Sequence, residues 1–402
     1  MKQFILSICL LLAISYPTIA RDPSQTMLMN YLARVSDKRA LLSNETFYRT
    51  MFQSFRNDHP RQYQAPDNET THYQIFQNRL KEAVENNIES NLTFTVGLNK
   101  FSDWKPKDLQ ILRGNRPPAS AVRTNYGMVA FSRTPRGRGS KKYNNQTPVI
   151  PPATFDYTTE VSKLNTSVSI IRPVRDQGYC GSCYAFAIIT LFEAQYAFHF
   201  GQAVNMSDQQ IVDCSTGDYG CVGGYFDTSF AYVQSYAWYL DSATDYPYKA
   251  VASTCSAKKT GGWSVDTSVY RHLTPGNASA MQEALLAFGP LWVSLYVGSD
   301  CSGTPKSKCP VDSNAASRIM HAFQSYTGGI FKIDGCVTSA DNNNHAMVIV
   351  GYGHDPNLGL DYWKLRNSWS SGWGEDGYVR IQRGVNMCNV ESDAFFIAKP
   401  AS

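Results

Sequence analysis

Residues 177–186, QGYCGSCYAF, contain two cysteines, Cys180 and Cys183, which are separated by Gly and Ser. Such a pair can be half of a zinc site, a redox-active dithiol, or two thiols with unrelated roles. A zinc site needs a second ligand pair at a fixed spacing, and the isolated His321 and His345 do not provide one. A redox dithiol normally follows the first strand of a small βαβ domain, a pattern that does not precede this stretch. Both interpretations are therefore weaker than the third.

The N-terminal stretch MKQFILSICLLLAISYPTIA (residues 1–20) has the features of a secretory signal peptide. Lys2 gives a positive start, residues 4–14 are almost wholly apolar, and small residues precede a cleavage point after Ala20. This apolar core is shorter than the roughly 20 residues that span a membrane, and we expect no span later in the chain. The mature protein is therefore expected to be soluble in the secretory pathway, in the lysosome or outside the cell. Seven N-x-Ser/Thr sequons, which permit glycosylation, agree with that route: Asn44, Asn68, Asn91, Asn145, Asn165, Asn205 and Asn277.

The cysteine count points to one special thiol. Ten cysteines are present, and Cys9 leaves with the signal peptide. An odd number in an oxidising compartment leaves one thiol free or paired with another chain. The remaining cysteines all follow residue 179: Cys180, Cys183, Cys214, Cys221, Cys255, Cys301, Cys309, Cys336 and Cys388.

The composition indicates a folded protein with a sizeable core. Of 402 residues, 43% are hydrophobic and 17% are charged, which argues against global disorder. The net charge of +4 is mild and shows no basic stripe, so we expect no nucleic-acid partner. We also expect a monomer that needs no metal or cofactor.

The chain divides into three parts after the signal peptide. Residues 21–112 are polar and helical, and residues 70–90 carry apolar side chains at mostly four-residue spacing, as in an amphipathic helix. Residues 113–152 are rich in Pro, Gly, Ser and basic residues and are predicted to be an exposed linker that proteases cut. Residues 153–402 open with a helix at 183–199 and continue with short strands such as HAMVIVGYG and LDYWKLRNSW. Helices followed by strands indicate an α+β region of two lobes.

In the third interpretation of the opening pair, Cys180 joins a disulfide and Cys183 stays free. Cys183 would then begin the helix at 183–199, where the N–H groups and the helix dipole favour an anion and so stabilise a thiolate. A thiolate is a strong nucleophile, and it requires a histidine partner for the proton.

The sequence resembles the papain-like cysteine proteases, the cathepsins, in several separate motifs. CGSCY with QG before it is similar to the nucleophile segment of that family. NHAMVIVGYG around His345 resembles the histidine strand, RNSWSSGWGEDGYVRI from Arg366 the asparagine segment, and GCVGGYFD from Gly220 the glycine pair of the substrate cleft. The resemblance implies a two-lobed fold with a helical left lobe and a β-barrel-like right lobe.

The N-terminal part carries a further motif, G-x-N-x-F-x-D, at Gly97, Asn99, Phe101 and Asp103. It is similar to a motif in the inhibitory propeptide of cathepsin L-like enzymes. Residues 21–112 are therefore expected to be the protein's own inhibitor, and polypeptides are its expected substrates.

The resemblance implies a role for each catalytic residue. Cys183 attacks the peptide carbonyl, and His345 forms an ion pair with the thiolate and later protonates the leaving amine. Asn367 accepts a hydrogen bond from the imidazole and fixes its orientation, and Trp369 shields that bond from water. Gln177 donates to the developing oxyanion together with the backbone N–H of Cys183.

The resemblance also implies the substrate-binding residues. Gly223 and Gly224 leave backbone accessible for an extended peptide. The pocket for the second residue before the scissile bond would be lined by Tyr225, Phe226 and Ala346, with Asp393 near its floor. From Asp393 we expect some acceptance of Arg or Lys in this pocket.

Three disulfides follow from the resemblance: Cys180–Cys221, Cys214–Cys255 and Cys336–Cys388. We add Cys301–Cys309 because of parity and proximity, which leaves Cys183 free. This last pair lies in residues 298–320, an insertion without a counterpart in the basic family pattern.

Two functions remain open. The first is an active endopeptidase made as a zymogen, which agrees with the complete set of catalytic residues and with the lack of an adjacent histidine pair that would bind a substrate carboxylate. The second is a catalytically inactive papain-fold binding protein. Tyr184 stands where the family usually has Trp after the nucleophile, and Ser370 stands where it usually has Gly, and either departure can alter packing.

Overall fold

The structure is a computed structural model that describes residues 22–61, 68–88, 92–116, 128–129, 151–159, 168–259, 261–265, 269–299, 301, 309, 311–337 and 339–398. The signal peptide and most of the expected linker lie outside these residues. Within the described part, no helix is long and apolar enough to cross a membrane.

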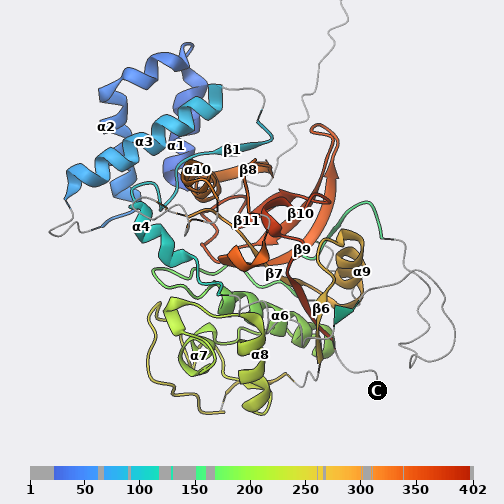
Figure 1. The fold of residues 1–402 in the computed structure, drawn as a ribbon. Helices are drawn as coiled ribbons and strands as arrows, with labels where there is room; N and C mark the ends of the chain where they lie inside the picture. The colour runs from blue at the N-terminus through green and yellow to red at the C-terminus, as the bar shows by residue number, and fades with distance from the viewer. Residues whose placement is uncertain are drawn as a thin grey trace, which may run out of the picture.

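An N-terminal helical unit forms one end of the molecule and has its own core (Figure 1). The predicted amphipathic helix is α3, whose apolar residues Phe76, Leu80 and Val84 are fully buried in a core that α3 shares with α1 and α2. The elements of this unit are α1 (Pro23–Arg34), η1 (Lys38–Ser43), α2 (Glu45–Asp58), α3 (Glu69–Ile88), β1 (Phe94–Val96), α4 (Pro106–Leu109) and η2 (Gln110–Leu112).

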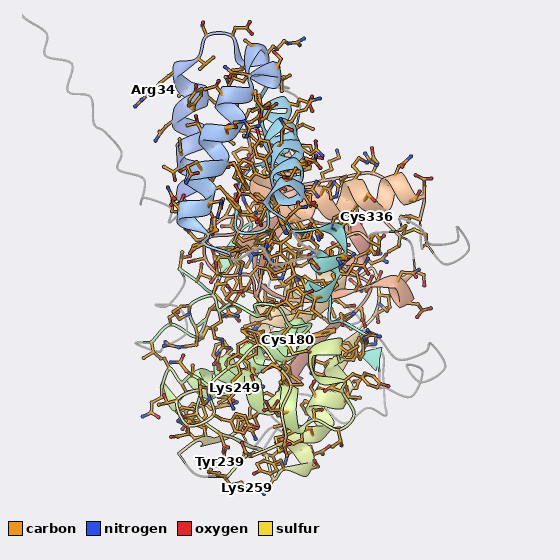
Figure 2. All side chains as sticks on the ribbon, turned by 90° about the vertical axis from the view of Figure 1, so that its left-hand side faces the viewer. Arg34, Cys180, Tyr239, Lys249, Lys259 and Cys336 are labelled. Atoms are coloured by element: carbon orange, nitrogen blue, oxygen red, sulfur yellow. A yellow bond between two sulfur atoms is a disulfide. The ribbon has the colours of Figure 1, made fainter. Side chains whose placement is uncertain are left out.

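The opposite end of the molecule is a second helical lobe around α6 (Figure 1). Figure 2 shows the two ends, with Arg34 on the first unit, Tyr239 and Lys259 on the second, and Cys180 between them. Nearly every side chain of α6 is buried, as expected for a helix that is apolar on all sides and lies between two layers. The elements of this lobe are α6 (Cys183–Phe200), α7 (Asp208–Cys214), η4 (Gly220–Val222), α8 (Phe226–Ser235), β4 (Tyr239–Leu240) and β5 (Trp263–Ser264).

A ten-stranded sheet lies between these two ends, in the order β1-β8-β11-β10-β9-β7-β12-β6-β2 with β3 on β9. Most neighbours are antiparallel, and the long strand β9 is buried over most of its length by α6. The N-terminal unit joins the sheet because β1 pairs antiparallel with β8. The remaining elements are β2 (Met128–Val129), β3 (Phe155–Asp156), β6 (Val269–Leu273), α9 (Ala278–Phe288), β7 (Leu291–Leu295), α10 (Ser313–Gln324), β8 (Tyr326–Phe331), η6 (Ala340–Asn342), β9 (His345–Asp355), β10 (Leu360–Arg366), β11 (Tyr378–Gln382), η7 (Met387–Asn389) and β12 (Ala394–Ala398).

The structure contains the four expected disulfides, Cys180–Cys221, Cys214–Cys255, Cys301–Cys309 and Cys336–Cys388. Cys183 is the remaining free thiol among the described cysteines. The sequence did not predict α10, which begins inside the insertion at 298–320 and packs its apolar face, including Ile319 and Phe323, against the sheet lobe.

Candidate active site

Cys183 is the first residue of α6 and lies at the boundary between the helical lobe and the sheet. Its Sγ accepts a hydrogen bond from the Ala346 N–H at 3.4 Å, so the thiol lies beside the residue that follows His345. Burial raises the pKa of Cys183 to about 11, although hydrogen bonds from backbone N–H groups, including those of Ala346 and Gly114, oppose this rise. In this closed state the side chain is therefore a thiol.

His345 is the first residue of β9, and its Nε2 lies 2.8 Å from the Oδ1 of Asn367. The ring of Trp369 lies against the imidazole, with the two ring centroids 4.8 Å apart. Burial lowers the pKa of His345 to about 4; hydrogen bonds to Asn367 and to the Leu112 carbonyl oppose this shift, and the charge of Arg113 adds to it. At pH values well above 4, the imidazole in this state is therefore neutral.

Gln177 connects the helical lobe to the segment that carries Asn367. Its Oε1 accepts from the Ser368 hydroxyl at 2.6 Å and from the Trp369 Nε1–H at 3.1 Å. Its Nε2 donates to the carbonyl oxygens of Cys180 at 2.8 Å and Leu112 at 3.0 Å. The amide N–H thus points at a carbonyl of the N-terminal unit.

Residues 112–116, which we call the covering segment, lie over this group of side chains. The Gly224 N–H donates to the Gly114 carbonyl at 2.8 Å, and the Arg116 N–H donates to the Gly224 carbonyl at 2.9 Å. A Cβ on Gly114 would lie 1.7 Å from the carbonyl oxygen of Gly181, so only glycine allows this close passage over the loop before Cys183. Within the linker that the sequence predicts to be exposed, Gly114 and Asn115 are buried, whereas Arg116 is exposed.

The four residues expected to line a substrate pocket lie near Gly224 and β9. Ala346, Tyr225 and Phe226 are buried, and the Phe226 ring stacks on Phe395 with centroids 4.5 Å apart. Asp393 is also buried, and Phe226 belongs to an aromatic cluster of the core rather than to an open wall.

Asp393 already has three partners in the structure. Its carboxylate accepts from the Tyr225 hydroxyl at 2.5 Å and the Ser294 hydroxyl at 2.6 Å, and it pairs with the His272 Nε2 at 3.1 Å. Burial would raise the pKa of Asp393, but the contacts with His272 and the two hydroxyls lower it below its ordinary value. Sequence reasoning missed His272 because it lies on β6, far from Asp393 in the chain.

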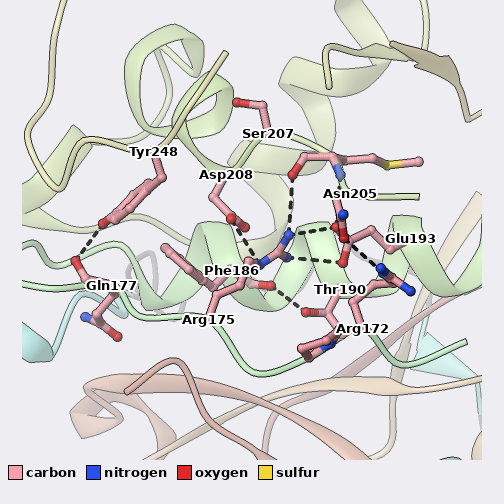
Figure 3. Close-up of polar contacts among 12 residues, drawn as sticks. Arg172, Arg175, Gln177, Phe186, Thr190, Glu193, Asn205, Ser207, Asp208 and Tyr248 are labelled. Carbon is pink, nitrogen blue, oxygen red and sulfur yellow. Dashed lines mark hydrogen bonds and ion pairs between the residues drawn. The ribbon is translucent and has the colours of Figure 1, made fainter. Parts of the chain in front are cut away.

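A cluster of charges, in which Glu193 and Asp208 are buried, lies beside α6 (Figure 3). Arg175 makes two hydrogen bonds to Glu193, at 2.7 and 3.1 Å, and lies 3.2 Å from Asp208. Arg366 crosses from β10 and donates to the Thr190 hydroxyl on α6 at 2.9 Å. Because Arg175 precedes Gln177 by two residues and Arg366 precedes Asn367, this cluster anchors both segments to the helix that carries Cys183.

The two departures from the family pattern are accommodated locally. The Tyr184 hydroxyl donates to the Gly220 carbonyl at 3.1 Å, which fixes the ring inside the helical lobe. Ser370 has φ +67°, the left-handed conformation that glycine adopts more easily. No group of three His, Cys, Asp or Glu side chains that could hold a metal occurs in the part of the chain that the structure describes.

Comparison with known proteins gives the same family that the motifs suggest. Residues 152–398 match the papain family of cysteine proteases, and residues 52–109 match the cathepsin propeptide inhibitor domain (I29). Cathepsin K of Mus musculus is 30% identical over 360 residues, which cover 88% of this chain and 94% of the relative. The cathepsin L-like proteinase of Phaedon cochleariae is 30% identical over 353 residues, covering 86% and 92%.

Solved proenzyme structures share the fold of the whole chain. Digestive procathepsin L2 from Tenebrio molitor larval midgut is 27% identical with a TM-score of 0.69, covering 88% of this chain and all of that one, 100%. Digestive procathepsin L3 from the same source is 26% identical with a TM-score of 0.67. These matches confirm the expected two-lobed α+β fold with a helical propeptide. The chain belongs to the papain family of cysteine proteases and carries the cathepsin propeptide inhibitor domain.

Proposed function

We propose that the protein is an endopeptidase zymogen in which Cys183 is the nucleophile, His345 its acid–base partner and Asn367 the residue that orients the imidazole. The observation that supports this most strongly is the covering segment, residues 112–116. A peptide backbone already lies across Cys183, with one carbonyl on the Gln177 amide and its neighbours paired to Gly224. A substrate backbone requires the same contacts.

The covering segment also explains why the precursor should be catalytically inactive. It excludes water from Cys183 and His345, and burial favours the neutral form of each. When the segment leaves, water and the helix dipole can stabilise the charged forms, and the proton moves from Sγ to the imidazole.

The reaction then proceeds in two steps. The Cys183 thiolate adds to the substrate carbonyl, and the oxyanion accepts hydrogen bonds from the Gln177 Nε2–H and the Cys183 N–H. His345 gives its proton to the leaving amine as the C–N bond breaks, which leaves an acyl-enzyme thioester. His345 next takes a proton from water, whose oxygen attacks the thioester; the C–S bond breaks, the acid leaves, and the Cys183 thiolate and His345 imidazolium are restored.

We propose that acid triggers release of the propeptide. Carboxylates are among the groups that hold it to the peptidase domain: Asp176 pairs with Lys100, the Glu82 Oε1 lies 3.7 Å from the His321 Nδ1, and Asp108 accepts from the Tyr179 hydroxyl at 3.3 Å. Burial would raise the pKa of Glu82, but His321 and Arg79 lower it below its ordinary value. Its stabilising contribution is therefore present above the ordinary pKa of 4.5 and is lost as the pH falls through the lowered value.

We propose that the pocket over Asp393 prefers apolar substrate side chains. This replaces the preference for Arg or Lys that we expected from the sequence. His272 and two hydroxyls already compensate the Asp393 carboxylate, so a substrate guanidinium would have to displace one of them. A substrate scan at the second residue before the scissile bond should favour Leu or Phe over Arg. A preference for Arg that Asp393→Asn abolishes would restore the original expectation.

The function is tested on the secreted precursor, lowered stepwise from about pH 5 to below pH 4.5 with a thiol reductant, beside its Cys183→Ala variant, because the Glu82 contact is lost only below its ordinary pKa of 4.5. The mass should fall by the propeptide, and hydrolysis of a fluorogenic peptide should appear in the wild type alone. If a precursor that an added protease has cut still hydrolyses nothing, the alternative of an inactive papain-fold binding protein is correct. The lysosome or the extracellular space remains the proposed location, because the four disulfides suit an oxidising compartment.

A further inference from the structure

Asp218 is a buried carboxylate, 8% exposed, that the proposed reaction does not use. Its Oδ1 accepts hydrogen bonds from the Tyr225 N–H at 2.9 Å and from the Thr228 hydroxyl. Its Oδ2 accepts from the hydroxyls of Ser215 at 2.6 Å and Ser229 at 2.7 Å. All four donors are neutral, and within the described chain no ion pair to Asp218 is found. The carboxylate is therefore held by directional hydrogen bonds, and it fixes the groups that donate to it.

These donors surround the backbone that pairs with the covering segment. A Cβ built on Gly224 would lie 2.4 Å from the Asp218 Oδ1, so the carboxylate lies directly behind the Cα of this glycine. Tyr225, the residue after Gly224, donates its N–H to the same oxygen. On the side of Gly224 that faces the covering segment, its N–H donates to the Gly114 carbonyl and its carbonyl accepts from the Arg116 N–H.

The same carboxylate also fixes the start of α8. Tyr225 is the N-cap residue of this helix, and its own side chain makes no capping hydrogen bond. Asp218 reaches from the preceding loop to Thr228 and Ser229 in the first turn. The loop, the glycine pair and the helix start are thereby joined at one point, as an N-cap side chain would join them.

We propose that Asp218 is a positioning residue of the peptide-binding edge. This edge is the Gly224 backbone, and Asp218 holds it in the orientation in which the Gly224 N–H and carbonyl pair with an extended peptide. In the precursor that peptide is the covering segment, and in the activated enzyme it is the substrate. The second half of this inference rests on the proposed function, and the first half does not.

The test variant is Asp218→Asn in the full-length precursor. The amide Nδ2 is a donor where the carboxylate oxygen is an acceptor, so at least one of the four donors loses its partner. In the precursor, the covering segment should loosen, and iodoacetamide should alkylate Cys183 about tenfold faster than in the wild type, the size expected for one charge-assisted hydrogen bond. This readout needs no catalytic activity, so it remains decisive if the proposed function fails.

In the activated enzyme, the expected effect is on KM. For a substrate with several residues before the scissile bond, KM should rise about tenfold while kcat changes less than about twofold. Alkylation of activated Cys183 should be unchanged, because iodoacetamide is too small to use the edge. A merely structural role would lower kcat and alter the alkylation rate as well.

The matched control is Asp213→Asn in the same lobe. Asp213 also accepts hydrogen bonds, from the Tyr246 hydroxyl at 2.9 Å, the Ser253 N–H at 2.7 Å and the Gln209 amide at 2.8 Å, and among the described residues none of these donors belongs to the edge. Ser229→Ala is the second test variant, since it keeps the carboxylate and removes one donor, and it should give a smaller shift in the same direction. Equal alkylation rates and equal KM values for the Asp218 and Asp213 variants would overturn the proposal.

Discussion

At the scale of single residues, the proposed mechanism gives Gln177 the same donor role in the precursor and in the activated enzyme. Its Nε2 donates to the Leu112 carbonyl in the precursor, where an oxyanion would lie during the reaction. Its Oε1 accepts hydrogen bonds from Ser368 and Trp369, which prevent the amide group from rotating by half a turn. The donor is therefore set in place before substrate binds, which is the condition for strong transition-state stabilisation.

Gln177→Ala should lower kcat of the activated enzyme by about 10²–10³, the cost of removing one oxyanion donor, with little change in KM. Steady-state kinetics on one fluorogenic peptide measure both constants. Gln234→Ala, on the exposed face of α8, is the control and should change neither. A rise in KM with an unchanged kcat would mean that Gln177 binds substrate rather than the transition state.

The residues that motifs predicted and those that they missed differ in one physical respect. Cys183, His345 and Asn367 lie in short stretches whose local pattern is recognisable, and the structure brings them together. Asp218 and His272 act through contacts with distant segments, and their neighbours in the chain carry no sign of those contacts. Such partners follow from tertiary packing and are not visible in periodicity.

At the scale of elements, strand β1 and the aromatic ring of Phe101 hold the propeptide against the peptidase domain. β1 extends the sheet through β8, and the Phe101 ring meets Trp369 at 5.4 Å between centroids. Phe101 belongs to the motif that the sequence identified, and the structure gives its role: the ring is buried and packs on the tryptophan that covers His345. The propeptide and the catalytic group are therefore coupled through direct contact.

Phe101→Ala should weaken docking of the propeptide, because a buried Phe→Ala change costs about 3–5 kcal/mol. At a fixed acidic pH the precursor should convert faster than the wild type, as followed by intact mass. Leu92→Ala removes an exposed apolar side chain of the same unit and is the control. Identical conversion rates for Phe101→Ala and the wild type would show that this contact does not hold the propeptide.

Element boundaries were predicted well where the pattern was strong. The helix expected at 183–199 is α6, Cys183–Phe200, and the amphipathic stretch 70–90 is α3, Glu69–Ile88. The burial of Gly114 and Asn115 was not predicted, because residues 113–116, RGNR, have the composition of a loop. Their burial depends on contacts with the cleft, and the neighbouring residues in the sequence do not indicate those contacts.

At the scale of the whole molecule, the charge cluster behind α6 joins the two lobes and responds to pH. Burial raises the pKa of Asp208 to about 7, and the charge of Glu193 adds to this, although Arg175 opposes it. A raised folded-state pKa means that the stabilising contribution is complete below the ordinary value of 3.8 and is lost as the pH rises through about 7. The fold should therefore be more stable in acid than at alkaline pH.

The Tm of the precursor should fall between about pH 5 and pH 8, and Asp208→Asn should reduce that fall because the amide does not titrate. Differential scanning calorimetry at several pH values measures this. Gln234→Ala, an exposed side chain that does not titrate, is the control and should leave the slope between those values unchanged. If the Tm of the Asp208 variant falls as much as that of the wild type, other groups cause the pH dependence.

The central claim is that the covering segment keeps Cys183 a buried, unreactive thiol until it is removed. The most direct measurement is the rate of Cys183 alkylation by iodoacetamide against pH, in the precursor and after activation, with the site of the adduct found by mass spectrometry. We expect the precursor to react slowly until the pH approaches the Cys183 pKa of about 11, and the activated enzyme to react rapidly from acidic pH upward. Equal rates in both forms across this range would contradict the account.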